Sequence, residues 1–114
     1  MTLVHASDDL TVDVAPRDDG VLVTLDGIVD LATAPELRAT LLPLVAPEHA
    51  LVLDLERVTF VDSTGLGVLV AAHRRAKATG GRFVLANPSA NLREVLRVTH
   101  LDQVIAIEVG HSSC

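Results

Sequence analysis

The sequence predicts an α/β protein with a mixed, mostly parallel sheet that begins with an antiparallel hairpin. Three observations lead to this class. Short apolar segments alternate with segments of helical periodicity along most of the chain. The first two strand-like segments are separated only by a charged turn, which is typical of a hairpin. Each later pair of strands is separated by a helix-length segment, as parallel crossovers require, so the expected order is β-β-α-β-α-β-α-β.

The N-terminal part of the chain carries the signals of the hairpin. Apolar and polar residues alternate over residues 10–14, as they do in a half-buried strand. Residues 16–20 are expected to form a charged turn, and residues 21–25 the antiparallel second strand. Residues 26–32, which contain Asp30, are expected to form a loop.

A capping box marks the start of the first helix. Thr33 is in position to cap it, Pro35 lies in the first turn, and Glu36 follows the cap by three residues. Pro43 is expected to end or distort this helix early, because proline lacks the N–H that a helix interior needs. The apolar face consists of Leu37, Leu41, Leu44 and Val45.

The central strand and helix flank a turn that contains a serine. Residues 51–55 have the pattern of a strand covered on both faces. Asp62, Ser63 and Thr64 can each accept hydrogen bonds from the free N–H groups of a helix start, and glycines at 80–81 are expected to end that helix. A hydroxyl is therefore presented at the positive end of a helix, where added negative charge is tolerated.

The last third of the chain continues the alternation of strands and helices. Its segments are a strand (82–86), a turn with a helix cap (87–89), a short helix marked by Leu92, Val95 and Leu96, a final strand (103–107) and a frayed tail (110–114). We expect the whole chain, 1–114, to fold as one domain with its core between about residues 10 and 107. The hydrophobic fraction of 49% is enough for a core without disulfides.

Six consecutive residues at the start of the central helix form a compact motif: Asp62, Ser63, Thr64, Gly65, Leu66 and Gly67. The motif matches D-S-[ST]-G-[LI]-G, and the chain resembles the STAS domain family, in particular the small bacterial anti-sigma factor antagonists, over roughly residues 10–107. The resemblance implies the STAS fold. It also implies that Ser63 is the phosphorylated residue, with Thr64 as a less favoured acceptor.

A second family signature, G-E-[IL]-D-x-x-[TS]-A, corresponds to residues 27–34. Ile28 stands where relatives have glutamate, so a partner contact made by that glutamate would differ here. His100 stands where relatives commonly have glycine at the end of the third helix, and we expect it to form a slightly strained left-handed cap. The resemblance assigns partner binding to Asp30, Leu31, Thr33, Asp62, Ser63, Thr64, Gly65, Leu66 and Gly67.

Several of these residues also have a purely structural interpretation. Ser63 could be a plain helix cap, and Asp62 could equally be a second cap. Asp30 could be a solvated turn residue. Gly65 and Gly67 could serve only close backbone packing.

Composition excludes several classes of function. The net charge of −6 disfavours nucleic-acid binding. The single cysteine, Cys114, allows no intrachain disulfide. The chain shows neither a signal-peptide pattern nor a run of 18 apolar residues. We therefore expect a cytoplasmic protein without membrane spans. The five histidines show no metal-binding spacing. Val61 stands where a G-x-S-x-G nucleophile elbow needs glycine, so we expect no enzyme.

The resemblance implies a partner switch. The unphosphorylated antagonist binds an anti-sigma factor and thereby frees a sigma factor. That anti-sigma factor is also a serine kinase of the histidine-kinase-like ATPase fold. Its phosphorylation of Ser63 separates the complex. A metal-dependent serine phosphatase restores the active form. The kinase brings the ATP and magnesium, so no cofactor is expected in this chain. Two alternatives remain: a STAS coupling subunit of a membrane transport assembly, and a nucleotide-binding module, although no P-loop motif is present.

Overall fold

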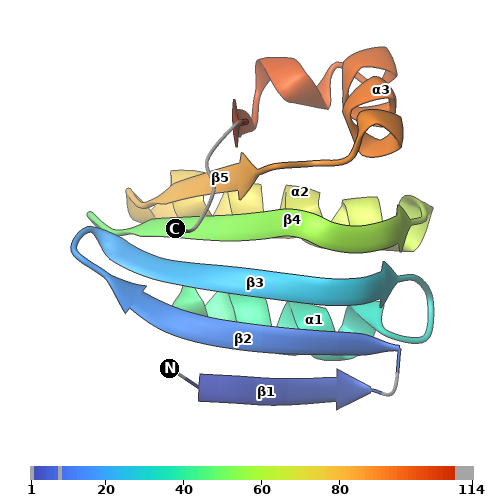
Figure 1. Ribbon diagram of the computed structural model, residues 1–114. Helices are drawn as coiled ribbons and strands as arrows, with labels where there is room; N and C mark the ends of the chain where they lie inside the picture. The colour runs from blue at the N-terminus through green and yellow to red at the C-terminus, as the bar shows by residue number, and fades with distance from the viewer. Residues whose placement is uncertain (1, 8, 110–114) are drawn as a thin grey trace.

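The structure is a computed structural model that describes residues 2–7 and 9–109, and this part of the chain forms a six-stranded sheet with three α-helices (Figure 1). The strands are β1 (Thr2–Ser7), β2 (Leu10–Arg17), β3 (Gly20–Val29), β4 (Ala50–Val61), β5 (Arg82–Ala86) and β6 (Ala106–Glu108). The helices are α1 (Ala34–Leu41), α2 (Ser63–Thr79) and α3 (Ala90–Val98), with short 3-10 helices η1 (Leu42–Leu44) and η2 (Leu101–Gln103). The predicted α/β class is confirmed.

The strands lie in the sheet in chain order, from β1 to β6. β1, β2 and β3 are antiparallel neighbours, whereas β3 to β6 are parallel. This confirms the mixed sheet with an N-terminal hairpin. The strand β1 was not predicted: its six residues lack regular alternation, and its pairing with β2 defines it.

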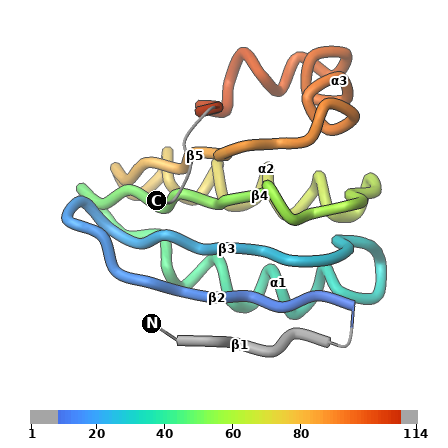
Figure 2. Tube along the Cα trace, in the orientation of Figure 1, coloured from blue at the N-terminus to red at the C-terminus, as the bar shows by residue number. Residues whose placement is uncertain are grey.

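The helices α1 and α2 lie on one face of the sheet (Figure 1). α1 lies behind β2 and β3, and α2 behind β4 and β5, while α3 lies beyond β5, at the opposite side of the sheet from β1 (Figures 1 and 2). Leucine and valine side chains from the strands and helices fill the space between the layers. Those fully buried include Leu25, Leu37, Leu53, Leu69 and Leu85.

The carboxyl ends of β3, β4 and β5 meet at one edge of the sheet, and each strand leads from there into a helix start. β3 leads to α1, β4 to α2 and β5 to α3 (Figure 2). In parallel sheets this edge is where ligand and partner sites are usually built. The serine-bearing motif at the start of α2 occupies its middle, because β4 lies between β3 and β5.

Element boundaries differ from the prediction in several places. β2 continues to Arg17 and β3 begins at Gly20, so the expected turn 16–20 is reduced to residues 18–19. β3 continues to Val29, so most of the expected loop 26–32 is strand, and β4 extends beyond residue 55 to Val61. The charged residues Glu56 and Arg57 interrupt the apolar pattern of β4, so the sequence did not indicate that the strand continues. Pairing with β3 continues past them with shifts in register. The final strand begins at Ala106 rather than at residue 103, because η2 occupies that position. The effect of Pro43 is confirmed: α1 ends at Leu41 and the proline lies in η1. The expected tail 110–114 lies outside the described residues.

Candidate functional site

Asp62 caps the start of α2. Its backbone is extended, and its carboxylate accepts a hydrogen bond from the Gly65 N–H at 2.9 Å. Ser63 is the first residue of the helix, is exposed, and uses its hydroxyl in no hydrogen bond with any other described residue. The interpretation of Ser63 as the helix cap is therefore wrong. Asp62 has that role, and the hydroxyl of Ser63 is left to solvent.

The first turn of α2 retains backbone donors for an anion. Helix starts leave their first N–H groups without intrahelical partners. The Asp62 side chain binds the N–H of Gly65, and the Asp62 carbonyl oxygen accepts the first helical bond, from Leu66, at 2.9 Å. The N–H groups of Ser63 and Thr64 precede these. A phosphate on Ser63 would thus meet free donors and the positive end of the helix, with the Asp62 carboxylate as a repelling neighbour.

The two glycines of the motif have different surroundings. Gly65 is buried, and a Cβ atom at this position would lie 2.8 Å from Cγ1 of both Val29 and Val61. Its missing side chain therefore lets α2 approach the ends of β3 and β4, which confirms a packing role for Gly65. Gly67 is exposed, and a Cβ atom there would meet nothing within 4 Å. A packing role for Gly67 is thus contradicted.

Asp30 and Thr33 close the loop between β3 and α1. The Asp30 Oδ1 atom accepts hydrogen bonds from the N–H groups of Ala32 at 3.0 Å and Thr33 at 3.1 Å. The Thr33 hydroxyl donates to the Ile28 carbonyl oxygen and accepts from the Asp30 N–H, each at 2.9 Å. Thr33 is the N-cap residue of α1, as predicted, but its hydroxyl makes no cap bond, so the hydrogen bonding of the predicted capping box is wrong. Thr33 closes the loop and is only 1% exposed.

The loop after β3 lies beside the start of α2. Val29 and Val61 are register partners at the ends of β3 and β4, and the Asp62 N–H donates to the Val29 carbonyl oxygen at 3.1 Å. The two segments that the sequence singled out are therefore brought together. Their exposed members are Leu31, Ser63, Thr64 and Gly67; Asp30, Asp62 and Leu66 are half-buried; Thr33 and Gly65 lie beneath. Leu31, at 73%, is the more exposed of the two leucines.

Two side chains of α2 and its cap, those of Asp62 and His73, are candidate bases for the Ser63 hydroxyl. The Asp62 carboxylate is engaged with a backbone N–H, and His73 on the same helix lies about 15 Å along its axis at about 1.5 Å per residue. No histidine on α2 is thus placed to activate the hydroxyl. Within the described residues, no group of three or more histidine, cysteine, aspartate or glutamate side chains could hold a metal ion. None of the helices described there is long and apolar enough to cross a membrane.

Phe60 is an exposed aromatic residue at this edge that the sequence reasoning missed. It is 54% exposed and precedes the motif by two positions in β4, whereas the other phenylalanine of the chain, Phe83, is buried. Its register partner in β3 is Ile28, the residue that replaces the family glutamate. The sequence could have indicated Phe60, because it is one of only two aromatic residues in a chain without Trp or Tyr and lies just before the motif.

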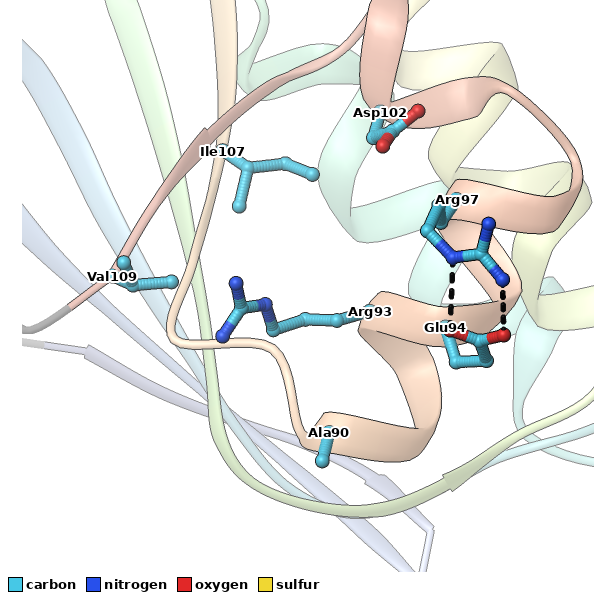
Figure 3. Close-up of a pocket in the computed structure, with 7 residues that line it drawn as sticks. All are labelled: Ala90, Arg93, Glu94, Arg97, Asp102, Ile107 and Val109. Atoms are coloured by element: carbon cyan, nitrogen blue, oxygen red, sulfur yellow. Dashed lines mark hydrogen bonds and ion pairs between the residues drawn. The ribbon is translucent and has the colours of Figure 1, made fainter.

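A hollow of about 550 Å³ lies between α3 and β6 (Figure 3). Arg97 binds Glu94 there, with its Nε atom 3.0 Å from Oε1, and this guanidinium lowers the pKa of the Glu94 carboxyl. The lining residues are Ala90, Arg93, Glu94, Arg97, Asp102, Ile107 and Val109. Two carboxylates balance the two guanidinium groups, and no glycine borders the hollow. The charged side chains of the lining therefore cancel, and the lining contains no glycine-rich phosphate loop.

Comparison with known proteins gives a consistent result. The family model described as STAS domain matches residues 11–113. The chain is similar to the anti-sigma-B factor antagonist of Bacillus subtilis, with 35% identity over 87% of this chain and 91% of that protein. It is similar to the crystal structure of an anti-sigma factor antagonist from Mycobacterium paratuberculosis, with a TM-score of 0.78 and 30% identity over 92% of this chain and 90% of that one. The phosphorylated form of the Bacillus cell fate determinant SpoIIAA shares the fold, with a TM-score of 0.69 and 23% identity over 89% of this chain and 92% of that one.

Proposed function

This chain belongs to the STAS domain family, and on that premise we propose that it is an anti-sigma factor antagonist switched by phosphorylation of Ser63. In the unphosphorylated form it binds an anti-sigma factor and thereby frees a sigma factor. The relatives that carry the name anti-sigma factor antagonist support this proposal, because they match over most of both chains.

The observation that carries the proposal is the exposed hydroxyl of Ser63 at the first position of α2. A neighbouring side chain, that of Asp62, already caps the helix, so the serine hydroxyl is not needed for capping. The free N–H groups of the first turn would donate hydrogen bonds to an added phosphate without a change of fold. This combination suits a residue that must be modified while the protein stays folded.

We place the partner-binding face on the exposed and half-buried members of the two joined segments. Leu31 and Leu66 supply apolar area, and Asp30 and Asp62 supply charge at its border. Gly67 leaves room for the partner to approach α2 closely, since nothing in the described structure fills the space where its side chain would be. Thr33 and Gly65 shape this face from below rather than contacting the partner.

The switch follows from charge and size. A phosphoserine carries about −1.5 to −2 charges at neutral pH. A partner surface that closes over a small hydroxyl would have to accept a dianion beside the Asp62 carboxylate, in an interface where unpaired charge is costly. Phosphorylation therefore releases the partner through local repulsion, with little refolding.

The partners in this proposal bring the chemistry. The anti-sigma factor acts as the serine kinase, has the histidine-kinase-like ATPase fold, and supplies ATP and magnesium. A metal-dependent serine phosphatase returns Ser63 to its free form. The chain itself acts as a cytoplasmic binding protein and kinase substrate, without catalysis, cofactor or nucleic-acid ligand of its own.

The experiment uses purified full-length chain and each purified anti-sigma factor of the histidine-kinase-like fold from the same genome. Each is mixed with the chain and Mg-ATP, and the products are mapped by mass spectrometry, with Thr64→Ala as a control for the neighbouring hydroxyl. We expect one kinase to place a single phosphate on Ser63 in the wild type and in Thr64→Ala. Phosphate on Thr64 alone, or no complex and no phosphate with any kinase, would contradict the proposal.

A further inference from the structure

A small apolar hollow of about 190 Å³ opens between the end of β4 and α3. Its floor includes Val58 and Leu92, which are 5% and 6% exposed, and its rim carries the exposed side chain of Phe60. The full lining is Val58, Thr59, Phe60, Val61, Ser89, Asn91, Leu92 and Val95. None of these residues is charged, although charged residues make up 21% of the chain.

The hollow adjoins the face that carries Ser63. Val61 lines it and is followed directly by the cap residue Asp62, and Val61 Cγ1 is one of the atoms that a Cβ at Gly65 would meet. The Asp30 loop follows β3, on one side of β4, whereas α3 follows β5, on the other side. The start of α2, which carries Ser63, therefore lies between the Asp30 loop on one side and this hollow on the other.

The chemistry of the lining limits what the hollow can receive. A nucleotide or a phospholipid headgroup is held most strongly by cationic side chains, and the lining offers none. Ser89 is the N-cap of α3, and its hydroxyl already accepts a hydrogen bond from the Leu92 N–H at 3.1 Å. An aromatic residue beside a small apolar pocket is the usual anchor of a protein interface. The available volume corresponds to one large apolar side chain.

We propose that this hollow receives one large apolar side chain of the anti-sigma factor and that Phe60 anchors the partner beside Ser63. This inference rests on the proposed function. It also predicts that the hollow supplies affinity and that Ser63 supplies the switch. Because the hollow contains no charge, it contributes to the affinity in the same way whether or not Ser63 bears a negative group, and the switch resides at Ser63 alone.

The test uses three full-length variants and the anti-sigma factor that binds the wild type. Phe60→Thr removes the aromatic ring while keeping a residue suited to a strand, and Phe60→Leu keeps an apolar side chain. Val104→Ala is the matched control, because Val104 is 56% exposed and lines neither the hollow nor the Ser63 face. Calorimetry gives the Kd, and thermal unfolding shows that each variant is folded.

We expect Phe60→Thr to raise the Kd by about tenfold or more, and Phe60→Leu and Val104→Ala to change it by less than about threefold. In a Ser63→Asp background, Phe60→Thr should raise the Kd by the same factor. Equal binding of folded Phe60→Thr and wild type overturns the anchor but leaves the proposed function intact. If wild type binds no anti-sigma factor, the proposed function fails and this inference fails with it.

Discussion

The backbone N–H of Asp62 donates a hydrogen bond to the carbonyl oxygen of Val29 at 3.1 Å. This bond joins the end of β3 to the residue that caps α2, so the Asp30 loop and Ser63 are held in fixed relation. Gly65 packs α2 against the same valine. The face around Ser63 is thus supported by backbone contacts, and a phosphate there changes its charge without needing to move it.

We expect the two glycines of the motif to respond oppositely to alanine. Gly65→Ala should lower the free energy of unfolding by about 1–3 kcal/mol, because its Cβ would overlap Val29 and Val61. Gly67→Ala should raise it by about 0.5–1 kcal/mol, because alanine suits a helix interior better and the position is open. Chemical denaturation of both variants checks this. Similar destabilisation by both would show that the space around Gly67 is filled.

Asp62 rather than Ser63 should carry the capping energy of α2. Asp62→Ala removes the hydrogen bond to the Gly65 N–H and should lower the free energy of unfolding by about 1 kcal/mol. Asp62→Asn keeps an acceptor at this position and is the matched control. Ser63→Ala should change stability by less than about 0.5 kcal/mol, since its hydroxyl is exposed and makes no hydrogen bond within the described structure. A larger loss in Ser63→Ala than in Asp62→Ala would reverse these assignments.

His100 should be replaceable by glycine with a gain in stability. Its φ of 62° is left-handed, a conformation that costs residues with a Cβ atom about 1–2 kcal/mol. After allowing for the greater chain entropy of glycine, His100→Gly should raise the free energy of unfolding by about 0.5–1 kcal/mol. Arg93→Gly, at an exposed position inside α3, should lower it instead. Thermal unfolding of the pair shows the contrast, and a loss in His100→Gly would count against strain at this residue.

The sequence predicted the parts of the fold whose signals are local. The apolar pattern at 51–55 and the D-S-T-G motif located the central strand and helix, because each depends on neighbouring residues only. The left-handed conformation of His100 was also predicted, since it follows from the place of that residue at a helix end. Strand length was not predicted: β3 reaches Val29 because β4 pairs with it, and that pairing joins segments distant in sequence.

The site shows the same limit in its hydrogen bonds. Thr33 had the spacing of a capping box, yet its hydroxyl bonds to Ile28 and Asp30 because β3 ends within reach of it. Two caps were conceivable at α2, and only the extended backbone of Asp62 distinguishes them. Phe60 was missed because a single exposed aromatic residue in a strand has no periodic signal. The outcome at Thr33 and Asp62 thus depends on backbone geometry where a strand ends and a helix begins, which residue types alone do not specify.

The last prediction concerns charge at Ser63. Ser63→Asp should be as stable as wild type, because an acidic residue in the first turn suits the helix dipole and Asp62 still caps. It should nonetheless bind the anti-sigma factor more weakly, by about tenfold or more, because one negative charge is then buried in the interface. Ser63→Ala should bind at least as well as wild type and remain bound when Mg-ATP is added.

Two measurements together test this ranking. Thermal unfolding gives the stability of Ser63→Asp and Ser63→Ala, and calorimetry gives their Kd for the anti-sigma factor, with and without Mg-ATP. Thr64→Asp adds the same group one residue away on the same proposed face, so comparing its Kd with that of Ser63→Asp shows how strongly binding depends on the position of the charge. Because only Ser63 is the proposed switch, Thr64→Asp should leave a hydroxyl that the kinase can still modify. If Ser63→Asp binds as tightly as wild type, charge at this position does not release the partner, and the switch must act by another route.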